Sequence, residues 1–89
     1  MTAATNGGAD TGLLGPGWYG SAAASATGDG AYLRALLDAE AALTRAQAAV
    51  GLAPAGAAAA VTEAADPARF DVGALAERAR AGGNPVIPL

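Results

Sequence analysis

The 89-residue sequence contains no cysteine and no histidine, and because its five basic residues are all arginine it contains no lysine either. Without cysteine there can be no disulfide framework, and without histidine as well the usual soft-metal ligands are missing. The same absences remove the side chains that most often act as nucleophile or general base near neutral pH. We therefore expect no soft-metal site in this stretch.

Large apolar residues are also scarce. Leucine (9), valine (4), isoleucine (1) and phenylalanine (1) fill 15 of the 89 positions, although hydrophobic residues reach 53% because alanine is so abundant. A domain of this size buries only about two-thirds of the surface that its unfolded chain exposes. The sequence thus supplies little material for a core of its own.

The charge balance narrows the possible partners. Eight acidic residues against five scattered arginines give a net charge of −3, and no basic stripe is present to follow a phosphate backbone. The first twelve residues lack the basic and apolar regions of a signal peptide, and no apolar run approaches the roughly 18 residues of a membrane span. We expect a cytoplasmic protein that binds neither nucleic acid nor a membrane.

Composition divides the chain into three parts. Residues 1–12 are small and polar and predict a disordered leader. Residues 13–28 are rich in glycine and proline, which predicts an extended arm anchored by its large side chains, Leu13, Leu14, Trp18 and Tyr19. Residues 29–89 predict a partial helical domain, so the fold class expected is all-α.

The strongest periodic signal predicts one long amphipathic helix of about five turns. Its apolar positions recur at helical spacing: Leu33, Leu36, Leu37, Leu43 and Val50. Thr27 or Asp29 is expected to cap the start, and Gly51 to end the helix. Glu40 falls on the apolar stripe. It either lies at the edge of the stripe or pairs with an arginine, and a catalytic carboxylate is the lesser alternative.

Two shorter helices are expected to follow. Pro54 predicts the start of the first, which must end before Asp66 and Pro67 because proline disfavours helical geometry in the residue ahead of it. Asp71 is the expected N-cap of the second, with Phe70 and Leu75 facing inward and Arg78 and Arg80 near its C-terminal end. After Gly82 and Gly83, the ending "GNPVIPL" predicts the start of a fourth helix, with Asn84 as N-cap and Pro85 in the first turn.

These residues carry a family resemblance. The segments "LLGPGWYG", "LLDAEAALTRAQAAVGLAPAGAAAAV" and "FDVGALAERARAGGNPVIPL", in this order from Leu13 to Leu89, resemble the N-terminal region of the 3-carboxy-cis,cis-muconate cycloisomerases. That family lies in the fumarase/aspartase superfamily of helical enzymes. The resemblance implies an N-terminal piece, truncated before a central helical bundle, of an enzyme that forms homotetramers.

The resemblance also implies a chemistry. Such enzymes add or remove a carbon-bound proton beside a carboxylate, without a metal, and the cycloisomerase closes a muconate carboxylate onto the diene to form a lactone in protocatechuate catabolism (the β-ketoadipate pathway). The substrate is a small tricarboxylate. The general base, usually a serine on a mobile loop, lies downstream of the matched region. The resemblance therefore implies no catalytic residue in this piece, no metal and no cofactor, and the piece alone is expected to be inactive.

Two residues of this sequence are candidates for substrate binding. Asn84 stands where the adenylosuccinate lyases usually carry a histidine, and its amide can donate a hydrogen bond to a substrate carboxylate or serve only as an N-cap. Trp18 lies where those lyases carry the tyrosine of a phosphate-binding Arg-Tyr pair, but Gly17 replaces the arginine. We expect Trp18 to be mainly a packing anchor.

Two alternatives to the cycloisomerase interpretation remain. An adenylosuccinate lyase-like piece of the same superfamily is disfavoured by Asn84 and Gly17. A free-standing, alanine-rich helical interaction module would need a larger core and a polar ending.

Overall fold

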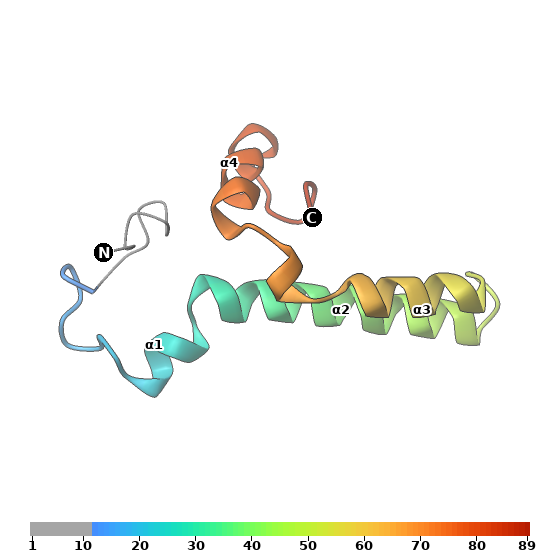
Figure 1. Ribbon diagram of the computed structural model, residues 1–89, viewed down its shortest axis with the longest axis horizontal. Coiled ribbons are helices and arrows are strands. Elements are labelled where there is room, and N and C mark those ends of the chain that lie inside the picture. Colours follow the sequence, from blue (N-terminus) through green and yellow to red (C-terminus); the bar gives the residue numbers. More distant parts are fainter. Residues whose placement is uncertain (1–11) are drawn as a thin grey trace.

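The computed structural model describes residues 12–89, and this part of the chain is helical without a β-strand (Figure 1). The predicted leader, apart from Gly12, lies outside the described residues. The elements in chain order are α1 (Ala22–Ala26), α2 (Asp29–Ala49), α3 (Ala55–Ala64), the 3-10 helix η2 (Pro67–Arg69) and α4 (Val72–Gly82). The all-α prediction, with one long and two shorter helices, is confirmed.

The arm differs from its prediction. Instead of running extended, it makes successive turns, in which Trp18 donates its N–H to the Gly15 carbonyl and Ser21 donates to the Trp18 carbonyl at 3.0 Å. Ser21 then caps α1, because its hydroxyl accepts a hydrogen bond from the Ala24 N–H at 3.1 Å. The glycines favour tight turns, and the alanine run after a serine N-cap favours a helix.

The start of α2 also corrects the prediction. Gly28 is the N-cap and makes no side-chain capping bond, while Asp29 lies inside the first turn, where a carboxylate suits the helix dipole. The Thr27 hydroxyl donates to the Ala23 carbonyl at 2.7 Å and so completes the end of α1. The predicted stop is confirmed, since Gly51 adopts a left-handed φ of 80° directly after the helix.

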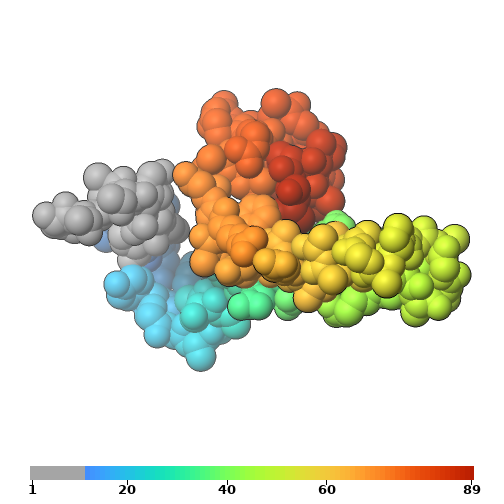
Figure 2. Space-filling model, turned by 45° about the vertical axis from the view of Figure 1, so that its right-hand side comes forward, coloured from blue at the N-terminus to red at the C-terminus, as the bar shows by residue number. Residues whose placement is uncertain are grey.

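The core lies where α2 meets the other helices. Leu33 and Leu37 of α2 and Leu75 of α4 are each at most 6% exposed, and Phe70 packs against them. Further along α2, Ala41 is buried, as is Ala58 of α3. Small side chains allow α3 to lie close along α2, as the yellow and green segments do in Figures 1 and 2.

Part of the predicted apolar stripe faces the solvent. Leu43 is 54% exposed and Val50 is 71% exposed. At 3.6 residues per turn, these two project from a different side of α2 than Leu37 and Ala41, against which α3 packs. The prediction that one stripe would hold all five large residues was therefore wrong for Leu43 and Val50.

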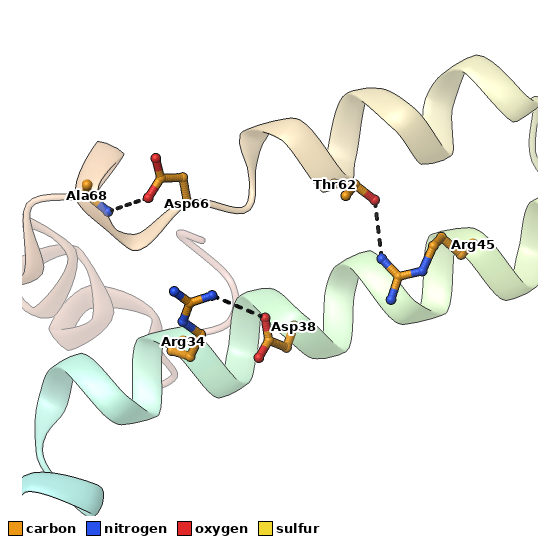
Figure 3. A network of polar contacts seen from close by, with 6 residues as sticks. All are labelled: Arg34, Asp38, Arg45, Thr62, Asp66 and Ala68. Carbon is orange, nitrogen blue, oxygen red and sulfur yellow. Dashed lines mark hydrogen bonds and ion pairs between the residues drawn. The ribbon is translucent and has the colours of Figure 1, made fainter.

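The later helices begin and end close to the predicted residues. Pro54 precedes α3, and Asp71 caps α4 by accepting a hydrogen bond from the Ala74 N–H at 3.0 Å. The unpredicted helix η2 forms at Pro67, where the Asp66 carboxylate accepts a hydrogen bond from the Ala68 N–H (Figure 3).

Surface polar contacts along α2 are few. The Arg45 guanidinium donates to the Thr62 hydroxyl of α3 at 3.3 Å, and Arg34 pairs with Asp38 one turn along the helix at 3.9 Å (Figure 3). All four residues are at or near the surface, where such contacts contribute about 1 kcal/mol at most.

The chain after α4 forms turns. Gly83 has a left-handed φ of 66°, and the Asn84 N–H donates to the Ala79 carbonyl at 3.2 Å, which closes the helix as predicted. The predicted start of a fourth helix is present only as a turn, in which Leu89 donates its N–H to the Val86 carbonyl. This segment, red in Figure 2, lies beside α4, and Leu89 packs against the core. Within residues 12–89, none of the helices has the length and apolar character needed to cross a lipid bilayer.

Candidate functional site

A groove of about 400 Å³ lies between the first half of α2 and α4. Its floor and walls are mostly apolar, and its polar groups stand at a few positions, as is usual for small-molecule sites. The polar residues that line it are Asp29, Tyr32, Arg80 and Asn84, and the apolar ones include Leu33, Leu36, Val72 and Leu75.

Asn84 enters the groove from the end of α4. The left-handed Gly83 turns the chain so that the Asn84 side-chain carbonyl accepts a hydrogen bond from the Val86 N–H at 2.7 Å. That bond orients the side chain and uses only its oxygen. The side-chain NH₂ makes no hydrogen bond within the described residues, so it can donate to a ligand while the oxygen holds the turn.

Arg80 lines the same groove and was not among the predicted site residues. It precedes Asn84 in the sequence, and its guanidinium contacts Glu77 at 3.4 Å in a solvent-exposed pair. Its position near the C-terminal end of α4 predicted only a favourable interaction with the helix dipole. Asn84 lies beyond the end of α4 and the left-handed Gly83, so helical spacing does not relate it to Arg80, and the sequence carried no signal that would bring the two residues to one groove.

Trp18 does not line this groove. Its ring lies against Gly15 within the arm and is part of a side chain that is 64% exposed. The structure therefore separates the two candidate residues, and the role of Trp18 stays a prediction.

Glu40 lies at the rim of a second hollow of about 350 Å³, lined by apolar residues that include Leu37, Val61 and Phe70. Its side chain is exposed and makes no ion pair with an arginine of residues 12–89. Of the two structural alternatives, the position at the stripe edge is confirmed, and pairing with an arginine within this region is not found.

No three acidic side chains come together anywhere in residues 12–89 in a way that would hold a metal ion. The groove contains an amide, a phenol, one carboxylate and one guanidinium. Such a set can bind and orient an anion through hydrogen bonds and charge.

Comparison with known proteins gives clear relatives, although no protein-family model matches the chain. The chain is 49% identical over 78 residues to a nitrosuccinate lyase from Streptomyces davaonensis, a match that covers 88% of this chain. It is 46% identical over 77 residues, or 86% of this chain, to a 3-carboxy-cis,cis-muconate cycloisomerase from Bradyrhizobium diazoefficiens. A cycloisomerase of the same name from Pseudomonas putida is 51% identical over 61 residues, or 68% of this chain.

The matched region is a small part of each relative. The chain spans 16% of the nitrosuccinate lyase and 17% and 14% of the two cycloisomerases. This chain thus corresponds to about a sixth of the relatives' length.

Proposed function

We propose that this chain, a homologue of part of the enzymes of the fumarase/aspartase superfamily, forms the N-terminal segment of a 3-carboxy-cis,cis-muconate cycloisomerase-like enzyme. The observation that carries the proposal is the identity of 46% and 51% to two cycloisomerases over most of this chain. We assign a binding and orienting role to this segment and the proton-transferring residues to the remainder of such an enzyme, because the resemblance places the general base downstream of the matched region.

In the proposed reaction a small tricarboxylate is rearranged without loss of atoms. One carboxylate oxygen forms a C–O bond to one carbon of a double bond of the diene. The electron pair of that double bond moves to the neighbouring carbon, and this carbon takes up a proton from a general acid. The ring formed is a lactone, an intermediate of protocatechuate catabolism. The negative charge that builds up beside a second carboxylate needs hydrogen-bond donors placed in advance.

Asn84 and Arg80 are the donors that this chain offers. The free amide NH₂ of Asn84 donates to a substrate carboxylate, and the exposed Arg80 guanidinium supplies positive charge at the same groove. Glu77 competes for that guanidinium, so Arg80 steers the substrate anion and Asn84 fixes its orientation.

A second candidate function comes from the nitrosuccinate lyase, to which the chain is 49% identical. Such a lyase would remove a carbon-bound proton and break the C–N bond, with nitrite as the leaving group. The same anion-binding role for Asn84 serves both reactions, because both substrates carry carboxylates next to the reacting carbons. An adenylosuccinate lyase-like function stays disfavoured by Asn84 and Gly17.

As proposed, the complete enzyme is a cytoplasmic homotetramer that needs no cofactor. The tetrameric state is tested by gel filtration with light scattering on the longer polypeptide that is made when translation continues past the Leu89 codon. The reaction is tested by incubating that polypeptide with 3-carboxymuconate and, separately, with nitrosuccinate. Loss of the conjugated-diene absorbance with formation of a lactone supports the cycloisomerase. Release of nitrite supports the lyase, and turnover of neither acid contradicts the proposal.

A further inference from the structure

The polar groups of the groove between α2 and α4 differ from one wall to the other. The wall formed by α4 and the turn after it carries two hydrogen-bond donors, the Arg80 guanidinium and the Asn84 NH₂. The wall formed by α2 carries the Asp29 carboxylate in the first turn of the helix and the Tyr32 phenol one turn further along. A ligand that crosses the groove therefore meets donors and positive charge at one end and a negative charge at the other.

The two opposite charges that line the groove do not neutralise each other. The ion pairs within residues 12–89 are Arg34 with Asp38 and Arg80 with Glu77. Asp29 and Arg80 thus lie beyond ion-pair distance of each other, although both line the groove. The Asp29 side chain is exposed, and no cation of the described residues offsets its charge at the α2 wall.

The α4 wall offers binding groups for one carboxylate only. Its one cation is Arg80, and that guanidinium already contacts Glu77 at 3.4 Å. A second carboxylate on the same ligand lies either outside the groove or at the α2 wall, beside the carboxylate of Asp29. Like charges brought together oppose binding, and a site can reject a close relative of its ligand in this way.

We propose that Asp29 determines the specificity of the groove: one carboxylate enters, held by Asn84 and Arg80, and a second carboxylate is excluded from the α2 wall. The ligand class is an acid that carries one carboxylate at the end of a hydrocarbon body and presents a neutral group to Asp29. The other carboxylates of a tricarboxylate substrate lie outside this groove. The inference rests on the anion-binding role proposed for the groove, and it adds the orientation of the substrate within it.

Two rigid acids test the proposal on the longer polypeptide. Terephthalate carries a carboxylate at each end of a benzene ring, and monomethyl terephthalate has a neutral ester at one end instead. Because the ring is rigid, the far group points to the wall opposite the bound carboxylate. Isothermal titration calorimetry measures Kd for each acid, and we expect the monoester to bind about threefold more tightly, as fits one solvent-exposed like-charge contact.

Variants show whether the Asp29 charge causes this preference. Asp29→Asn is expected to abolish it by tightening terephthalate binding about threefold, with little change for the monoester. Asp29→Glu keeps the charge and should keep the preference. Glu63→Gln, on the exposed surface of α3, is the matched control and leaves both affinities unchanged. Asn84→Asp is expected to weaken both acids, which locates the bound carboxylate in the groove.

Four results would overturn the inference. They are a parent that binds terephthalate at least as tightly as the monoester, an equal preference in the parent and in Asp29→Asn, loss of the preference in Asp29→Glu as well, and binding that Asn84→Asp leaves unchanged or that is absent. The calorimetry does not depend on turnover. A polypeptide that converts 3-carboxymuconate but shows one of these results contradicts the inference alone, whereas the expected affinities without turnover of either acid contradict only the proposed reaction.

Discussion

Asn84 carries the most specific functional claim at the scale of single residues. Its side-chain oxygen holds the turn after α4 through the Val86 N–H, while its NH₂ remains available in the groove. The residue type alone suggested both a cap and a substrate contact. In the structure the oxygen makes the hydrogen bond of the turn, which leaves the NH₂ for the substrate contact that we propose.

The substitution Asn84→Asp in the complete enzyme separates the roles experimentally. Aspartate caps about as well as asparagine and keeps the oxygen that accepts from Val86, so the melting temperature is expected to stay unchanged. It replaces the NH₂ donor by a negative charge, and kcat/KM is expected to fall tenfold or more, equivalent to about 1.4 kcal/mol. Steady-state kinetics and a thermal melt on the same preparation check this. Parent-like kinetics would limit Asn84 to the turn.

Glu40 gives a prediction of the opposite kind. Its position on the apolar stripe predicted either a place at the edge of the stripe or a pair with an arginine. In the structure the side chain is exposed and has no ion pair within residues 12–89, so Glu40→Gln is expected to change the free energy of unfolding of the complete enzyme by no more than about 0.5 kcal/mol. Urea unfolding of the two proteins measures the difference. A loss above about 1 kcal/mol would mean that a partner outside this segment holds Glu40.

At the scale of elements, local signals located the helices well. The stop at Gly51, the start after Pro54 and the cap at Asp71 all depend on nearest neighbours in sequence, and the structure agrees with each. The predictions failed where the burial of a residue depends on packing against another element. The exposure of Leu43 and Val50 depends on the side of α2 against which α3 packs, and periodicity does not carry that information.

The cap of α4 is expected to be the main local determinant of that helix. Asp71→Ala removes the acceptor of the Ala74 N–H and should cost about 1 kcal/mol, whereas Asp71→Asn keeps a capping oxygen and should be nearly neutral. Amide hydrogen exchange measured across residues 72–82 is the appropriate readout. Equal protection in both variants would show that packing of Leu75, and not the cap, holds α4.

At the scale of the whole molecule, the described residues form an elongated structure, with principal extents of 49 × 28 × 26 Å. The core has three large side chains at its centre, from α2 and α4, and several large apolar residues remain exposed, among them Leu43, Val50, Leu52 and Ile87. The low count of large apolar residues foretold a small core. The groove between α2 and α4 could not be predicted from the sequence, because the angle between two helices that are distant in sequence creates it.

The small core leads to a prediction about the isolated 89-residue chain. Partial helicity is expected in the far-ultraviolet circular dichroism spectrum, with a gradual loss of signal on heating, because few buried side chains melt together. A cooperative transition above about 60 °C, which is typical of a robust mesophilic domain, would favour the alternative of a free-standing helical module.

The central claim, that this chain is a binding segment of a larger cycloisomerase-like enzyme, is tested most directly by one paired measurement of turnover. The rate of 3-carboxymuconate consumption is followed by ultraviolet absorbance for the purified 89-residue chain and for the polypeptide read on from the Leu89 codon, at equal concentration. We expect no detectable rate for the chain alone, since it has no histidine, lysine or cysteine to move the proton, and lactone formation by the longer polypeptide. Turnover by the 89-residue chain itself, or none by the longer polypeptide, would contradict the account.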